Sequence, residues 1–117
     1  MSRHYRDLIA WQKAMELVKG LYPLTKQFPD DERFGLTSQL RRAAVSVPSN
    51  IAEGQGRLTS GEFKQFLGHA RGSLFETETQ LILAADFGYL ANTDADLLLN
   101  QSGEVSRILN GLIQSLT

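Results

Sequence analysis

The feature that most constrains the fold is an unbroken run of apolar and small residues spaced alternately four and three apart, with no proline inside it. Its members are Phe63, Leu67, Ala70, Leu74, Thr77, Leu81, Ala84 and Gly88. The alternation approximates the 3.5-residue repeat with which one helix presents a single seam to another. Because the segment is long and its other faces are largely polar, it does not fit an isolated core helix. The sequence therefore predicts a long helix within a helical bundle.

The first predicted helix begins near Asp7, whose carboxylate is suited to cap the free N–H groups of the first turn, and it ends before Phe28. Pro23 removes an intrahelical donor, so we expect a kink there. Residues 30–35 are a connector with room for one short helical turn. The predicted inward-facing residues of this helix are Leu8, Trp11, Met15, Val18, Tyr22 and Thr25.

The second predicted helix begins at Thr37 or just before it. It ends at residues 54–56, Gly-Gln-Gly, because glycine accepts the left-handed conformation of a helix end. Pro48 lies within this helix and is expected to bend it. The predicted inward-facing residues are Leu36, Leu40, Ala43, Val47 and Ile51.

Thr59 or Ser60 is expected to cap the long third helix, with Glu62 at the positive end of its dipole. The third helix ends at Gly88, and a turn over residues 91–94 begins a fourth. Four helices with short connections predict one all-α domain over residues 1–117, an antiparallel up-down-up-down four-helix bundle. The predicted inward-facing residues of the fourth helix are Leu98, Ser102, Val105, Leu109, Leu112 and Leu116.

The third and fourth helices carry more apolar residues than one seam uses. A second stripe left exposed would form a patch larger than monomers usually tolerate. Either the stripes are simply wide, or the extra residues pack against other copies of the chain. We favour the second interpretation, a homo-oligomer. The extra residues are Phe66, Phe75, Ile82, Leu83 and Phe87 in the third helix, and Leu97, Leu99, Ile108 and Ile113 in the fourth.

Composition limits the classes of function. The chain has no cysteine, which excludes disulfides, thiolate metal sites and cysteine catalysis, and its formal net charge is −1. No apolar run approaches the roughly 20 residues of a membrane span. The residues Trp11-Gln12-Lys13 interrupt any apolar segment near the start, so no secretory signal is expected. The predicted location is the cytoplasm.

Several blocks of the sequence resemble one family. These blocks are residues 7–14 (DLIAWQKA), 28–29 (FP), 32–36 (ERFGL) and 39–54 (QLRRAAVSVPSNIAEG), together with Phe63, Phe66, Leu67, Ala70, Gly72-Ser73-Leu74 and Glu76. They are similar to the four-helix-bundle family named after proteins encoded in intervening sequences of 23S ribosomal RNA.

The resemblance implies a four-helix bundle that assembles into a homo-oligomeric ring, expected to be a pentamer. It also implies a relation to the accessory variability proteins of diversity-generating retroelements, which are basic barrels that bind nucleic acid and a reverse transcriptase. Unlike those proteins, this chain is mildly acidic overall.

Between Arg33 and Arg57 the chain has four arginines against one acid, Glu53. Such a basic surface would contact phosphates in a salt-dependent, sequence-independent way. The alternative is a solvated surface with local ion pairs. The candidate nucleic-acid contacts are Arg33, Arg41, Arg42, Arg57, Lys64 and Arg71.

One face of the second helix gathers polar side chains three or four residues apart. It is either a ligand-binding face or a hydrogen-bond network, since Pro48 leaves the carbonyl of Ala44 without its usual donor. Glu76 of the third helix is expected to pair with Arg41 or Arg42. The face comprises Arg42, Ser46, Asn50 (or Ser49) and Glu53, and the predicted polar network comprises Ser46, Asn50, Glu53 and Glu76.

Gly68 and Gly72 are spaced to allow a close helix–helix approach, so we interpret them as packing residues. His4 and His69 are the only histidines, and there is no Glu-x-x-His motif, so neither a metal nor a cofactor is expected.

The favoured hypothesis is a non-enzymatic homo-oligomeric scaffold or adaptor that contacts nucleic acid or a nucleic-acid-processing protein. The competing hypothesis is a small helical-bundle hydrolase or nuclease that uses Glu53, His69 and Glu76. It requires these side chains to converge within hydrogen-bond reach.

Overall fold

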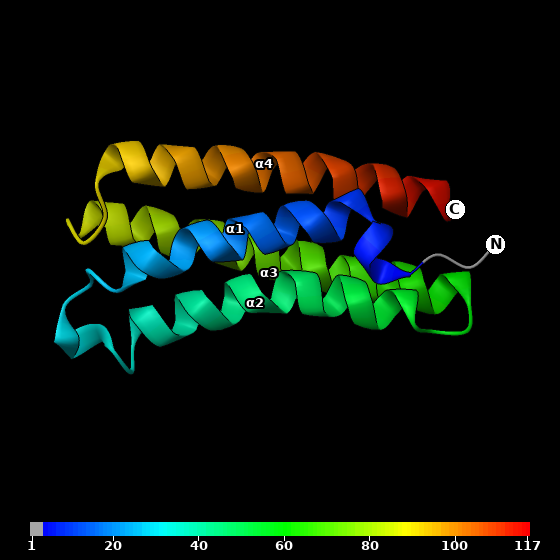
Figure 1. The fold of residues 1–117 in the computed structure, drawn as a ribbon, viewed down its shortest axis with the longest axis horizontal. Coiled ribbons are helices and arrows are strands. Elements are labelled where there is room, and N and C mark those ends of the chain that lie inside the picture. Colours follow the sequence, from blue (N-terminus) through cyan, green and yellow to red (C-terminus); the bar gives the residue numbers. More distant parts are fainter. Residues whose placement is uncertain (1–3) are drawn as a thin grey trace.

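The computed structural model describes residues 4–117, and in this part of the chain four long helices lie side by side along a molecule of 46 × 24 × 19 Å (Figure 1). The helices are α1 (Ile9–Thr25), α2 (Leu36–Gln55), α3 (Ser60–Asp86) and α4 (Asn92–Ser115). Two short 3-10 turns, η1 (Tyr5–Asp7) and η2 (Asp30–Glu32), precede α1 and α2. Residues 4–117 contain no strand, which confirms the predicted all-helical class.

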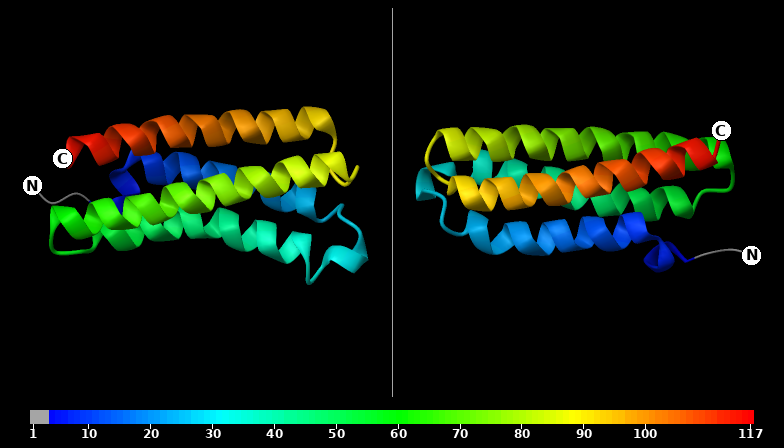
Figure 2. Two further views of the ribbon diagram at one scale, coloured as in Figure 1. Left: turned by 180° about the vertical axis from the view of Figure 1, so that it is seen from behind. Right: turned by 90° about the horizontal axis from the view of Figure 1, so that it is seen from above.

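The four helices surround one common core. α1 packs against α2 and α4, and α3 packs against the same two helices, whereas the backbones of α1 and α3 do not approach each other closely within the described residues. The α1–α2 and α3–α4 connections lie at one end of the molecule, and the α2–α3 connection lies at the other (Figures 1 and 2). Each helix therefore has an outer face that no other part of the described chain covers.

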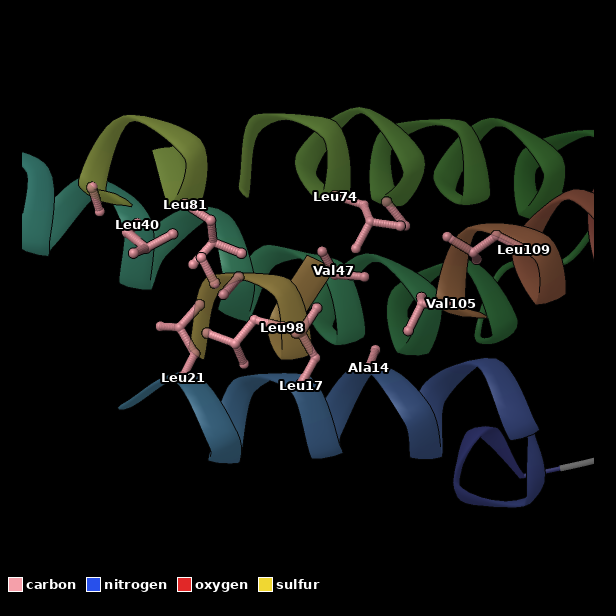
Figure 3. Packing of buried hydrophobic residues seen from close by; sticks show 14 of the residues in the cluster. Ala14, Leu17, Leu21, Leu40, Val47, Leu74, Leu81, Leu98, Val105 and Leu109 are labelled. Carbon is pink, nitrogen blue, oxygen red and sulfur yellow. The ribbon is translucent and has the colours of Figure 1, made fainter. Parts of the chain in front are cut away.

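The predicted seam of α3 is the centre of the core. Six of its eight residues are buried, Phe63 is half-buried, and Gly88 lies beyond the helix end. The five predicted inward residues of α2 are buried as well. Figure 3 shows leucine, valine and alanine side chains from all four helices meeting in this core.

The predicted inward face of α1 is confirmed at Thr25 and is otherwise wrong by one helical position. The core residues are Ala10, Ala14, Leu17, Leu21 and Thr25. Two of these five residues are small alanines, so they fill little of the core. The larger side chains of the predicted set lie beside the core, with Trp11, Met15 and Val18 half-buried and Tyr22 exposed.

The predicted cap of α3 is confirmed. Thr59 Oγ1 accepts a hydrogen bond from the Glu62 backbone N–H at 3.1 Å and donates one to Glu62 Oε1 at 3.1 Å. The first of these bonds satisfies one free backbone donor of the first turn, and the second links the two capping side chains. The predicted Asp7 cap is wrong: Asp7 belongs to η1, and Leu8 begins α1 without a side-chain cap.

Glycine ends α2 as predicted, but not through a left-handed residue. Gly56 has a φ of −80°, and among the described residues only Gly88 has a positive φ, 79°. Pro23 and Pro48 both lie inside continuous helices. None of the described helices combines the length and the apolar character that crossing a bilayer requires.

Candidate partner-binding groove

An open groove of about 680 Å³ lies on the outer surface of α1 and α2, at the end that carries η2. Its lining combines three arginines with two aromatic residues, four serine or threonine residues and one valine, and none of the lining residues is acidic. Such a groove suits an anionic or acidic partner. The lining residues are Arg33, Arg41, Arg42, Tyr22, Phe34, Thr37, Ser38, Ser46, Ser49 and Val45.

The arginines of the groove differ in how they are held. The Arg41 guanidinium lies 4.7 Å from the centre of the Tyr22 ring, and its Nε donates to Thr25 Oγ1 at 2.8 Å. Arg33 lies 4.8 Å from the ring of Phe34, which is 84% exposed. Arg42 is exposed and has no hydrogen bond or ion pair within residues 4–117. Arg42 is therefore free to meet an incoming carboxylate or phosphate.

A second, apolar hollow of about 340 Å³ adjoins the first and shares Val45 and Ser49 with it. It is lined by the large α1 side chains that lie beside the core, and the Tyr5 and Trp11 rings meet edge-on there at 5.3 Å. We call the two hollows together the α1–α2 groove. One half of it is basic and the other apolar. The remaining residues of the apolar half are Met15, Val18, Pro48 and Ala52.

The other three predicted basic contacts lie outside the groove. Arg57 pairs with Glu53 at 3.3 Å and stacks on Phe66 at 4.5 Å. Lys64 donates to Thr117 Oγ1 at 3.2 Å, and Arg71 donates to Asn110 Oδ1 at 2.9 Å. The six candidate residues therefore form two separate sets, of which only Arg33, Arg41 and Arg42 share one surface.

The predicted polar network is formed in part. Asn50 Nδ2 donates to the backbone oxygen of Ser46 at 2.8 Å and to Ser46 Oγ at 2.9 Å. Ser46 Oγ is also 2.8 Å from Ser73 Oγ, so the network joins α2 to α3. Sequence reasoning missed Ser73, because the register between the two helices was not known.

Glu53 and Glu76 lie outside this network. Glu53 pairs with Arg57 on its own helix. Glu76 is exposed, and no ion pair in residues 4–117 joins it to Arg41 or Arg42. The expected pairing inside one chain is therefore wrong, and Glu76 is exposed to solvent instead of forming a partly buried ion pair.

The side chains of the proposed hydrolase are not brought together by any contact in the described chain. His69 is exposed and meets Phe66 edge-on at 5.7 Å. Glu76 follows it by two helical turns, about 10 Å along the axis. No group of three His, Asp or Glu side chains that could hold a metal occurs in residues 4–117.

The outer face of α3 carries a second run with the four-three spacing: Gly68, Gly72, Phe75, Thr79, Ile82 and Asp86. All six residues are exposed, and we call this run the outer seam. Phe75 and Ile82 are each 49% exposed. A Cβ added at Gly68 or Gly72 would meet nothing within 4 Å. The close approach predicted for these glycines therefore does not occur within the described chain.

The surplus apolar residues consequently fall into two groups. Leu99, Ile108 and Ile113 pack against the core, as expected of a wide stripe, and Phe66 is half-buried. The members on the outer surface of α3, together with Leu97, stay exposed.

Glu32 forms two hydrogen bonds that hold η2 against the start of α2 and against the α3–α4 connection, beside the basic half of the groove. Its Oε1 accepts a hydrogen bond from the Leu36 N–H at 3.1 Å, and its Oε2 accepts one from the Tyr89 hydroxyl at 3.0 Å. The bond to the Glu32 carboxylate raises the pKa of Tyr89 above its ordinary value. Sequence reasoning missed this residue, although an acid just before a helix start is a signal for capping.

Two comparisons place the fold among known proteins. A family model described as 23S rRNA-intervening sequence protein matches residues 6–111. A solved structure with a TM-score of 0.80 is a protein of unknown function from the S23 ribosomal protein family of Bacteroides thetaiotaomicron; it is 23% identical over 90% of this chain and 98% of that one. This likeness shows a shared fold. No curated protein matches the chain.

Proposed function

The chain belongs to the family of 23S rRNA-intervening sequence proteins, and from this we propose that it is a non-enzymatic scaffold built by self-assembly. In this proposal the subunit is an antiparallel up-down-up-down bundle, and copies of it form a homo-oligomeric ring, expected to be a pentamer. The ring acts in the cytoplasm as an adaptor for nucleic acid or for a nucleic-acid-processing protein.

The observation that supports self-assembly is the exposure of the outer seam. Phe75 and Ile82 are half exposed, two helical turns apart on one face of α3. Completing the burial of such a side chain contributes on the order of 1 kcal/mol, since full burial contributes about 1.5–3 kcal/mol. Large apolar side chains that gather on one exposed helix face favour an interface with another protein or another copy.

Sedimentation or light scattering at micromolar concentration tests this proposal. The wild-type protein is expected to have a mass that is a multiple of the 13.0 kDa subunit. The double variant Phe75→Ser/Ile82→Ser is expected to be a helical monomer. Leu58→Ser is the matched control, because Leu58 is 96% exposed in the α2–α3 connection and outside the outer seam. A wild-type monomer at all concentrations would contradict the proposal.

A second candidate function is nucleic-acid contact through the groove. It is favoured by the acid-free lining with three arginines and by the exposed ring of Phe34, which is suited to stack on a base. Binding of a single-stranded RNA oligonucleotide is then expected to fall steeply as salt rises, and Arg42→Glu is expected to weaken it. The same groove cannot hold an RNA strand and another protein segment at once.

A further inference from the structure

We propose that the α1–α2 groove of one copy binds the outer seam of α3 of the next copy, so that Arg42 meets Glu76 of its neighbour. This inference rests on the proposed homo-oligomer and identifies its two contact faces. It assigns the groove to a second copy of the chain rather than to nucleic acid.

The two surfaces match in shape and length. The outer seam is a straight ridge from Gly68 to Asp86, about 27 Å long at 1.5 Å per residue. The groove follows α2 from Thr37 to Ala52, about 23 Å by the same measure. Phe75 and Ile82 supply apolar side chains to the ridge, and the lack of side chains at its glycines allows another helix to lie close.

The two surfaces also have opposite charge. Between Gly68 and Asp86, the span of the outer seam, α3 has three acids (Glu76, Glu78 and Asp86) and one arginine (Arg71), and Glu76 and Asp86 are exposed. The groove has three arginines and no acid. Glu76 and Arg42 are both exposed, and neither is paired within the described chain. Pairing between copies gives each charge a partner, and opposite potentials favour this orientation.

The register between α2 and α3 places Arg42 and Glu76 at similar positions along the long axis of the bundle. Ser46 lies opposite Ser73, and a Cβ added at Gly54 would be 2.7 Å from the Cβ of Phe66, so the two helices run in opposite directions. At equal rise per residue, Val45 is therefore level with about Phe75, and Arg42 is within about one turn of Glu76.

If neighbouring copies are related by a rotation about an axis parallel to the bundle, each residue keeps its position along that axis. The neighbour's Phe75 then arrives at Val45, where the basic and apolar halves of the groove meet. The neighbour's Asp86 arrives near Phe34, beside Arg33.

The contact joins two different surfaces, one on α1 and α2 and the other on α3. Each copy therefore offers one groove and one seam, which makes the interface heterologous. Such an interface generates a ring when the rotation from one copy to the next closes after a whole number of copies. A bound RNA strand would also neutralise the arginines, but it would leave the outer seam uncovered.

A charge-swap experiment tests the inference. Arg42→Glu and Glu76→Arg each place like charges against each other, and each is expected to raise the concentration needed for half-assembly by at least about 10-fold. The double variant Arg42→Glu/Glu76→Arg restores opposite charges and is expected to return this concentration to within about 3-fold of wild type. Because both side chains are exposed and unpaired, circular dichroism is expected to show a folded subunit in every case.

The matched control is Arg107→Glu/Asp96→Arg, which reverses two exposed charges on α4 outside both surfaces. It is expected to leave assembly unchanged. A second pair of variants tests the contact by steric bulk. Gly72→Gln fills the outer seam and is expected to weaken assembly, whereas Gly111→Gln on α4 is expected to leave assembly unchanged. Neither glycine has an atom within 4 Å of an added Cβ, so both variants are expected to fold.

The outcomes separate the inference from the proposed function. A wild-type monomer contradicts both. If the wild-type protein is an oligomer and neither single charge reversal weakens its assembly, the inference is wrong but the proposed scaffold function is not contradicted. Single reversals that weaken assembly without rescue in the double variant overturn the Arg42–Glu76 pairing. If Arg42→Glu abolishes binding of a single-stranded RNA and leaves the mass unchanged, the groove is a nucleic-acid site and the inference is wrong.

Discussion

At the scale of single residues, Ser46 joins α2 to α3 through hydrogen bonds. Its hydroxyl group contacts both Asn50 and Ser73, at 2.9 and 2.8 Å. These polar atoms are half-buried between two helices, where an unmade hydrogen bond is costly. The network therefore acts in stability and in the register between α2 and α3, on which the proposed interface depends.

Ser73→Ala removes one of these hydrogen bonds and is expected to lower the free energy of unfolding by about 1 kcal/mol. Urea unfolding followed by circular dichroism measures the change. Ser115→Ala is the control, because Ser115 is exposed and bonds only to the Leu112 carbonyl near the end of α4. The control is expected to stay within about 0.5 kcal/mol of wild type. Equal effects of the two variants would contradict a structural role for Ser46.

The Tyr89–Glu32 hydrogen bond predicts a pH effect. Because the carboxylate favours the protonated phenol, the pKa of Tyr89 is raised above 10.0 in the folded protein. The stability from this bond is fully present below pH 10.0 and is lost as pH rises through the raised pKa. Absorbance titration of Glu32→Gln is expected to show one of the three tyrosine transitions at lower pH. An unchanged titration would show that the bond is absent in solution.

At the scale of elements, α2 and α3 are packed most closely at Gly54. A Cβ there would lie 2.7 Å from Phe66 Cβ and 3.3 Å from the Phe63 carbonyl oxygen. A backbone atom and a Cβ move only when the helices separate, so the glycine sets the distance between α2 and α3.

Gly54→Ala is therefore expected to destabilise the protein by about 1–3 kcal/mol. Gly111→Ala, in the open interior of α4, is expected to stabilise it by about 0.5–1 kcal/mol, because alanine is the better helix former. Thermal and urea unfolding measure both variants. Effects of the same sign would contradict the close approach.

The four-three periodicity was sufficient to predict the elements. It located the seam of α3, the core face of α2, and the Thr59 cap. It did not identify the core face of α1, since that helix has two apolar stripes one residue apart. Residue size misled the prediction, because the small Ala10 and Ala14 are buried in the core while the large Trp11 lies beside it.

The candidate site was predicted only in part for a similar reason. The cluster of Arg33, Arg41 and Arg42 follows from spacing on one helix and its preceding turn. The groove itself needs the position of α1 against α2, which sequence spacing does not provide. The predicted ion pair of Glu76 with Arg41 or Arg42 inside one chain was wrong, because helical spacing does not show whether two side chains on neighbouring helices meet.

At the scale of the whole molecule, charge is divided between two sides. The basic groove lies on α1 and α2, and the acidic, apolar seam lies on α3. A molecule with two unlike complementary faces is expected to associate head to tail, and the free energy of association then adds to the stability of each folded subunit.

The thermal midpoint of the wild-type protein is therefore expected to rise by several degrees over a 100-fold increase in protein concentration, since mass action favours the folded oligomer. Arg42→Glu is expected to show a midpoint that depends little on concentration. Differential scanning fluorimetry or calorimetry measures both. A concentration-independent midpoint for the wild-type protein would contradict assembly in this range.

The only tryptophan of the chain, Trp11, lines the apolar half of the groove and is half-buried in the isolated subunit. A second copy seated there would exclude water from the indole ring. Dilution of the protein should then shift its intrinsic emission to longer wavelength, so the molecule carries a built-in optical reporter of its own dissociation.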